Sequence, residues 1–117
     1  MSKGELESVQ QITAWAEKTG GKKLLQRIEI LGFVDEKRSV NWLVEAGALT
    51  LNMLTKGSLN HLKNQLKKTP VEHFGDIAKT IDYATKQGRQ VNIYLEDWSN
   101  GYLHSPAYMF EFIDFLT

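Results

Sequence analysis

Polar side chains that could bind a ligand recur at every second position of the segment 90–96. Asn92, Tyr94 and Glu96 alternate there with aliphatic residues. Because alternate residues of an extended strand share a face, one face would carry an amide, a phenol and a carboxylate, which can hydrogen-bond a polar ligand. Asn52 occupies a similar position in an earlier apolar segment. These four residues are the first candidates for a binding site.

Several other chemistries lack the residues they need. The chain has no cysteine, which excludes disulfides, thiolate metal sites and a cysteine nucleophile within it. Its three histidines, His61, His73 and His104, are far apart and do not have metal-ligand spacing. Neither a Gly-x-Gly-x-x-Gly sequence nor a P-loop occurs. The sequence therefore favours a hydrogen-bonding site over a thiol, metal or phosphate-loop site.

The length of 117 residues suits one domain, residues 1–117. Fourteen basic residues balance fourteen acidic ones, so charge gives no reason to expect nucleic-acid or anionic-membrane binding. The N-terminus lacks the apolar core of a signal peptide, and no apolar run is long enough to span a membrane. We expect a soluble, cytoplasmic protein.

Helical and extended periodicities alternate along the chain. A capping box at Ser2 and Glu5 starts the first helix, and Thr69-Pro70 followed by Glu72 starts another. The predicted elements are a helix from Ser2 to Gly20-Gly21, a strand at 27–34, a helix ending at Gly47, a strand at 48–54, a helix at 58–68, a helix from Thr69 to Gly88, a strand at 90–96, a polar loop at 97–104, and a last helix from Ser105-Pro106 carrying Met109, Phe110, Ile113 and Leu116.

This alternation predicts an α/β fold with parallel βα units. Two interpretations of the polar strand faces remain open. They could meet water, as in a half-exposed sheet, or they could face the interior of a barrel. In a barrel, side chains at the carboxyl ends of the strands line the site, which would make Asn52, Tyr94 and Glu96 site residues.

The segment 91–97, Val-Asn-Ile-Tyr-Leu-Glu-Asp, resembles the fifth barrel strand of the isopropylmalate/homocitrate synthase-like family, also called hydroxymethylglutaryl-CoA-lyase-like or pyruvate carboxyltransferase. The stretches 58–69, 98–101 and 105–108 are similar to the same family. We expect the resemblance to cover essentially the whole chain. It implies a partial (β/α)8 TIM barrel in which the three predicted strands are strands three to five of eight. A closed barrel needs about 250 residues.

The resemblance also implies a chemistry. Members of this family are acyl-CoA C-acyltransferases that join an acyl-CoA to a 2-oxo acid in a Claisen condensation at a divalent metal. Their metal ligands lie in an Arg-Asp/Glu-Gly-Glu-Gln motif on strand one and a His-x-His pair on strand seven. Neither motif occurs here. We expect a divalent metal only in the full-length parent enzyme, no cofactor in this chain, and no activity from the chain alone.

The resemblance assigns binding roles to strand-end residues. Glu96 matches a pocket carboxylate that accepts hydrogen bonds from the oxo acid or its hydroxy product, although pairing with a lysine is the simpler alternative. Asn92 and Tyr94 stand where homocitrate synthases have an Arg and a Ser, and loss of the Arg removes a bidentate carboxylate clamp. We expect Asp97 to be structural, holding the turn that follows it.

The remaining candidates are histidines and lysines of the middle of the chain. His61 matches a Ser-x-x-His segment of the family and could contact substrate, but a solvated histidine is the alternative. His73 and His104 look incidental. Four lysines form a run that is typical of a solvated helix face, with phosphate contact to coenzyme A as the alternative: Lys56, Lys63, Lys67 and Lys68.

An alternative function from a different class is a self-standing, non-catalytic α/β binding or regulatory module of flavodoxin-like type. It predicts a monomer with helices on both sheet faces. The barrel fragment instead predicts a bare face and bare edges, which template association. In that case we expect a homo-oligomer formed through the exposed sheet face or edges.

Overall fold

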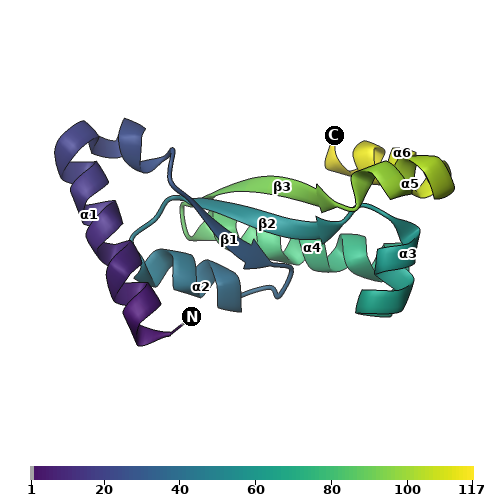
Figure 1. The fold of residues 1–117 in the computed structure, drawn as a ribbon, viewed down its shortest axis with the longest axis horizontal. Coiled ribbons are helices and arrows are strands. Elements are labelled where there is room, and N and C mark those ends of the chain that lie inside the picture. Colours follow the sequence, from purple (N-terminus) through teal and green to yellow (C-terminus); the bar gives the residue numbers. More distant parts are fainter. Residues whose placement is uncertain (1) are drawn as a thin grey trace.

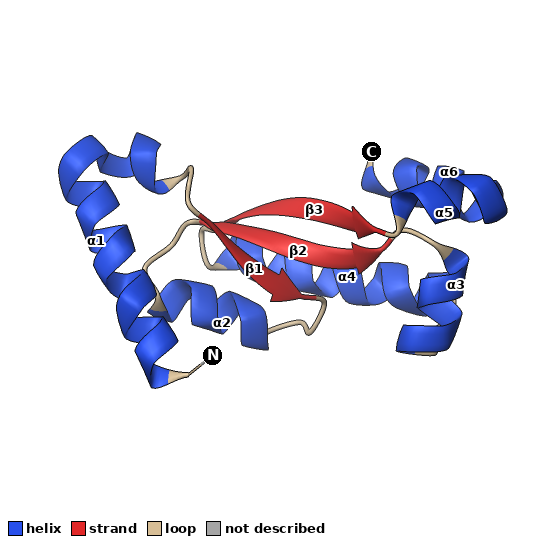
Figure 2. Cartoon of the chain, viewed as in Figure 1, coloured by secondary structure: helices blue, strands red, loops and turns tan. Residues whose placement is uncertain are grey.

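A computed structural model describes residues 2–117. The chain alternates helices and strands in the order shown in Figure 1 and, by secondary structure, in Figure 2. The elements are α1 (Lys3–Leu25), β1 (Glu29–Phe33), α2 (Arg38–Glu45), β2 (Thr50–Lys56), α3 (Leu59–His61), the π-helical turn η1 (Leu62–Leu66), α4 (Pro70–Lys86), β3 (Gln90–Glu96), α5 (Trp98–His104) and α6 (Pro106–Leu116).

The three strands form one parallel sheet in the order β1-β2-β3. Residues in register across the sheet include Leu31, Asn52 and Asn92 in one row. In the last row, Lys56 faces Glu96. The predicted α/β class and its parallel βα units are confirmed.

Helices α2 and α4 cover one face of this sheet (Figure 1). Leu51 and Met53 of β2 are fully buried beneath them, together with Leu43 of α2 and Ile77 of α4. The aliphatic residues of β3 pack against the same core. Burial of these side chains is the main force that holds the sheet to its helices.

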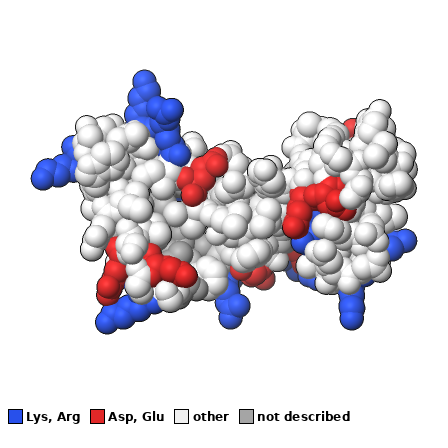
Figure 3. Space-filling model, in the orientation of Figure 1, with Lys and Arg blue, Asp and Glu red and all other residues white. Residues whose placement is uncertain are grey.

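The opposite face of the sheet is uncovered. Leu31, Phe33 and Tyr94 expose 58%, 53% and 58% of their surface there. On the side of the molecule seen in Figure 3, Lys and Arg side chains project mainly at the edges. The two covered faces expected of a flavodoxin-like module are therefore not seen, because the described helices pack on one side only.

Local signals located several helix boundaries correctly. Both predicted capping boxes form, at Ser2 with Glu5 and at Thr69 with Glu72. β3 has the predicted bounds, whereas β1 begins two residues later than expected and β2 is displaced by two residues. Strand ends depend on pairing with neighbours, which the local pattern does not contain.

The first helix does not stop at Gly20-Gly21. Gly21 has φ +64°, which breaks the helical hydrogen bonding, but the chain returns to helix as far as Leu25. Leu25 is buried, and its burial gives a physical reason for the helix to resume. The glycine therefore marks a kink and not an end.

Residues Trp98–His104 form helix α5, so the prediction of a polar loop at 97–104 is wrong. Asp97 takes the left-handed conformation (φ 64°) and turns the chain out of β3. Gly101 then packs directly on the backbone of Gly57, where a Cβ atom would lie 1.9 Å from the Gly57 carbonyl oxygen. Polar residues with low helix propensity are thus held helical by a contact distant in sequence.

The buried stripe of α6 also differs from the prediction. Tyr108, Met109 and Phe112 are buried, whereas Phe110 is 59% exposed. Phe74 of α4 stacks on Tyr108 at 6.0 Å between ring centroids and meets Phe112 edge-on at 5.1 Å. This aromatic packing selects the helix face that turns inward.

Candidate functional site

The carboxyl ends of β2 and β3 carry a cross-strand ion pair. The Nζ atom of Lys56 contacts the Oε2 atom of Glu96 and donates to Oε1 of Gln65 at 3.2 Å. Only 18% of the Lys56 side chain is exposed, and 39% of Glu96. Lys56 is therefore not part of a solvated helix face as expected, because the strand register holds it against Glu96.

Two buried side chains form hydrogen bonds with the backbone of Lys56. Its N–H donates to Nε2 of His73 at 3.1 Å, and its carbonyl oxygen accepts from the Tyr108 hydroxyl at 2.6 Å. Burial lowers the pKa of His73 to about 4, so its imidazole is neutral and Nε2 is free to accept. Burial likewise raises the pKa of Tyr108, which keeps its hydroxyl protonated as a donor.

The prediction that His73 is incidental was wrong. It is 1% exposed and lies edge-on to Phe112 at 5.9 Å. One sequence signal could have revealed this burial: His73 precedes buried Ile77 by four positions, which puts both on the inward stripe of α4.

A cavity of about 210 Å³ opens beside this arrangement. Glu96, Lys56 and His73 supply its polar groups. Its apolar lining comes from the end of β1, from β2 and from η1: Phe33, Val34, Leu54 and Leu66. The cavity thus lies where the strand ends meet, and Glu96 both pairs with a lysine and lines a cavity.

The other predicted site residues of the sheet lie on its uncovered face. Asn52 donates to Oε2 of Glu29 at 3.5 Å, and Asn92 donates to Oε1 of the same carboxylate. The Oδ1 atom of Asn52 is buried without a partner among residues 2–117. Tyr94 lies two residues closer than Asn92 to the carboxyl end of β3. The structure therefore joins Asn52 and Asn92 through Glu29, which the prediction did not include although it shares their strand face.

His61 lies apart from those residues, in a cluster around Asp97. Oδ2 of Asp97 accepts from the Ser58 hydroxyl at 2.7 Å and lies 3.4 Å from Nε2 of His61, while Oδ1 accepts from Asn100 at 2.7 Å. The Ser58 hydrogen bond, with help from Asn100 and nearby imidazoles, lowers the pKa of Asp97. The bond to Asn100 is the structural role predicted for Asp97. Because Ser58 donates to the carboxylate and not to the imidazole, the cluster is not a serine–histidine relay.

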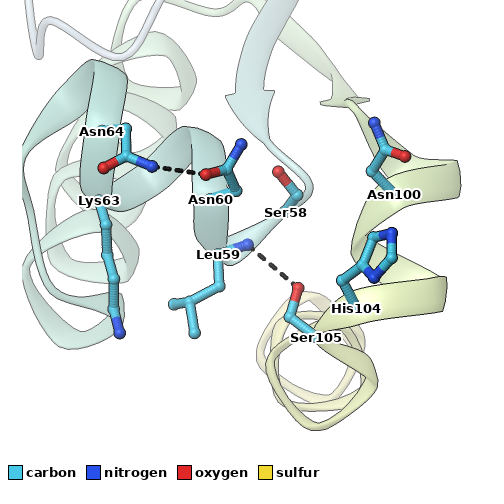
Figure 4. Close-up of a pocket in the computed structure, with 8 residues that line it drawn as sticks. All are labelled: Ser58, Leu59, Asn60, Lys63, Asn64, Asn100, His104 and Ser105. Carbon is cyan, nitrogen blue, oxygen red and sulfur yellow. Dashed lines mark hydrogen bonds between the residues drawn. The ribbon is translucent and has the colours of Figure 1, made fainter.

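A larger cavity, of about 570 Å³, separates α3 and η1 from α5 (Figure 4). Asn60, Lys63 and Asn64 line one side. Asn100 and His104 line the other, on the helix that the sequence did not predict. No acidic residue is among the side chains that line this cavity.

Two groups of features are missing from the described part of the chain. Within residues 2–117, no three His, Asp or Glu side chains lie together so that they could hold a metal ion. No helix in that range is both long and apolar enough to cross a bilayer.

Comparison with known proteins gives a partial match. No protein-family model matches the chain. The chain is 29% identical over 73 residues to an (R)-citramalate synthase of Streptomyces coelicolor. The matched segment is 62% of this chain and 14% of that protein, so the chain spans about one seventh of the length of the curated relative it matches.

Proposed function

We propose that this chain forms one wall of a (β/α)8 barrel of the isopropylmalate/homocitrate synthase type. The parent enzyme would be an acyl-CoA C-acyltransferase that condenses an acyl-CoA with a 2-oxo acid. One observation carries the proposal: a parallel three-stranded sheet ends in a polar cavity at Lys56 and Glu96, in a chain that resembles a citramalate synthase.

In this proposal the strand-end residues bind the polar substrate. Glu96 accepts a hydrogen bond from a substrate hydroxyl, and Lys56 fixes the position of that carboxylate. Tyr94 offers a hydroxyl two rows deeper, with Asn52 and Asn92 further along the same face. His61 contacts Asp97 and supports the turn at Asp97 between β3 and α5.

The divalent metal of such enzymes would supply Lewis acidity toward the oxo acid. The residues of this chain do not fit that metal, because no group of three suitable side chains occurs within residues 2–117. We therefore assign no step through it here and expect its ligands on other strands of the parent. The purified chain is expected to release no thiol from an acyl-CoA in the presence of a 2-oxo acid and Mg²⁺.

A chimera tests the proposal. Residues 50–97, from the start of β2 to the residue after β3, replace the residues that align with them in the Streptomyces coelicolor protein, and thiol release is measured. We expect an active chimera that Glu96→Gln slows by about 100-fold, because the substrate loses a charge-assisted hydrogen bond inside the closed barrel. The matched control is Asp82→Asn, at an exposed carboxylate of α4, which should leave the rate unchanged.

The chimera also has outcomes that contradict the proposal. A chimera with native circular dichroism and a cooperative melt but no activity would show that this segment is not a barrel wall. Full activity of the Glu96→Gln chimera would show that Glu96 does not bind substrate, although the segment would still be a barrel wall.

The uncovered sheet face leads to a second proposal, self-association of the isolated chain. Leu31, Phe33 and Tyr94 offer an exposed apolar surface, and β1 and β3 have free edges. Sedimentation velocity at tens of micromolar is expected to show a concentration-dependent dimer or larger species, which Phe33→Lys weakens. A single monomeric species across that range would contradict it.

A further inference from the structure

The cavity between α3–η1 and α5 has no part in the function proposed above. It lies beyond the strand ends and outside the sheet, between two helical segments that face each other (Figure 4). Its volume of about 570 Å³ is within the range of small-molecule sites, about 300–1,000 Å³. A space of this size between polar helical segments is large enough for an organic ligand.

The hydrogen bonds around the cavity show which groups remain available. The Ser58 hydroxyl donates to Asp97, and the Ser105 hydroxyl donates to the carbonyl of Gly101 while accepting from the Leu59 N–H. These groups are therefore occupied. By contrast, Lys63 and His104 form no side-chain hydrogen bond or ion pair with any residue in the range 2–117.

The available groups are mainly donors. Lys63 brings an ammonium group from one wall and His104 an imidazole from the other. Asn60 accepts from Asn64 through Oδ1, which leaves its own amide N–H groups free. Asp97 lies behind Ser58 and Asn100, and both of its carboxylate oxygens are already occupied by those donors.

A phosphoryl group matches this set of donors. It presents several strong acceptor oxygens around one centre, and lysine binds it as a compact positive charge. A carboxylate has only two oxygens and is matched best by the planar fork of arginine, which is missing from the lining. Inorganic phosphate would fill a small part of the cavity, so the ligand needs an organic remainder.

We propose that this cavity binds a phosphorylated metabolite of about mononucleotide size, with its phosphoryl group between Lys63 and His104. The asparagine side chains, which donate and accept, would then hydrogen-bond the hydroxyl or ring nitrogen atoms of the organic part. The proposal does not depend on the barrel function, because it uses none of the strand-end residues.

Nuclear magnetic resonance titration of the full 117-residue chain tests this site. The probes are adenosine 5′-monophosphate, inorganic phosphate and adenosine, at constant ionic strength. We expect saturable amide shifts with the monophosphate, confined to residues 58–64 and 100–105, with a dissociation constant of about 1 mM or lower. Phosphate should shift the same residues with weaker affinity, and adenosine should not bind.

Substitutions of Lys63 test the role of its positive charge. Lys63→Gln should weaken binding of the monophosphate about tenfold, as expected for loss of a charged hydrogen bond. Lys63→Arg should retain binding. The matched control is Lys18→Gln, at an exposed lysine of α1, which should have no effect. The proposal would be overturned if adenosine bound as tightly as the monophosphate, or if inorganic phosphate did. It would also be overturned if the shifts were spread over the lysines of the whole chain, or if they did not saturate.

Discussion

Acidification should destabilise this protein through His73. Burial is the main cause of the low pKa of this imidazole; the charge of Asp76 raises the pKa, and those of Lys68 and Lys56 lower it. The unfolded chain takes up the proton near the ordinary value of 6.5, and the folded chain only at about 4. Between these values the unfolded state binds more protons, so the free energy of unfolding falls as the pH falls.

The size of this effect follows from the two pKa values. The free energy of unfolding should fall by about 2 kcal/mol between pH 7 and pH 5, and by about 3 kcal/mol by pH 4, from His73 alone. The structure gives the reason. A protonated Nε2 could no longer accept the N–H of Lys56, and the charge would be buried beside Phe112.

The assay is urea unfolding followed by circular dichroism at pH 7, 6, 5 and 4. His73→Gln keeps an acceptor for Lys56 but does not titrate. Its free energy of unfolding should therefore fall by about 3 kcal/mol less between pH 7 and pH 4 than that of the unsubstituted chain. His104→Gln, at an exposed histidine, serves as the control and should follow the unsubstituted chain. Equal pH dependence of His73→Gln and the unsubstituted chain would refute the reasoning.

Three substitutions test the packing near the strand ends. Gly101→Ala places a Cβ atom against the carbonyl of Gly57, and thermal unfolding should show a loss of about 3 kcal/mol. At Gly75 in α4, an added Cβ atom would have no neighbour within 4 Å, so Gly75→Ala should raise the free energy of unfolding by about 1 kcal/mol. A more stable Gly101→Ala variant would contradict the close approach of Gly101 to Gly57. Tyr108→Phe removes the donor to the Lys56 carbonyl and should cost about 1–2 kcal/mol in urea unfolding; an unchanged midpoint would show that this bond contributes nothing.

The features that sequence reasoning predicted correctly depend on near neighbours. The start of α4 follows from Thr69, Pro70 and Glu72, which lie within four residues. β3 has its predicted bounds because its aliphatic and polar residues alternate without interruption. The polar strand face was predicted for the same reason, and Asn92, Tyr94 and Glu96 do share a face away from the helices.

The features that were missed depend on contacts between distant segments. Lys56 and Glu96 are 40 positions apart, and only the strand register brings them together. His73 is buried because α6 packs over it. Helix α5 forms at Gly101 because the backbone of Gly57 lies against it. The inward position of His73 is indicated locally, by its place four residues before Ile77, but the contacts themselves join distant segments and leave no signal in a local pattern.

The position of α1 has a consequence for dynamics. This helix lies at one end of the molecule (Figure 1) and is tied to α2 by two side-chain bonds, from Thr13 to the carbonyl of Ala46 and from Gln10 to that of Glu45. Trp15 on its outer side is 60% exposed. An element with so few buried contacts opens without unfolding the core, so its amide hydrogens should exchange with solvent well before those of α4.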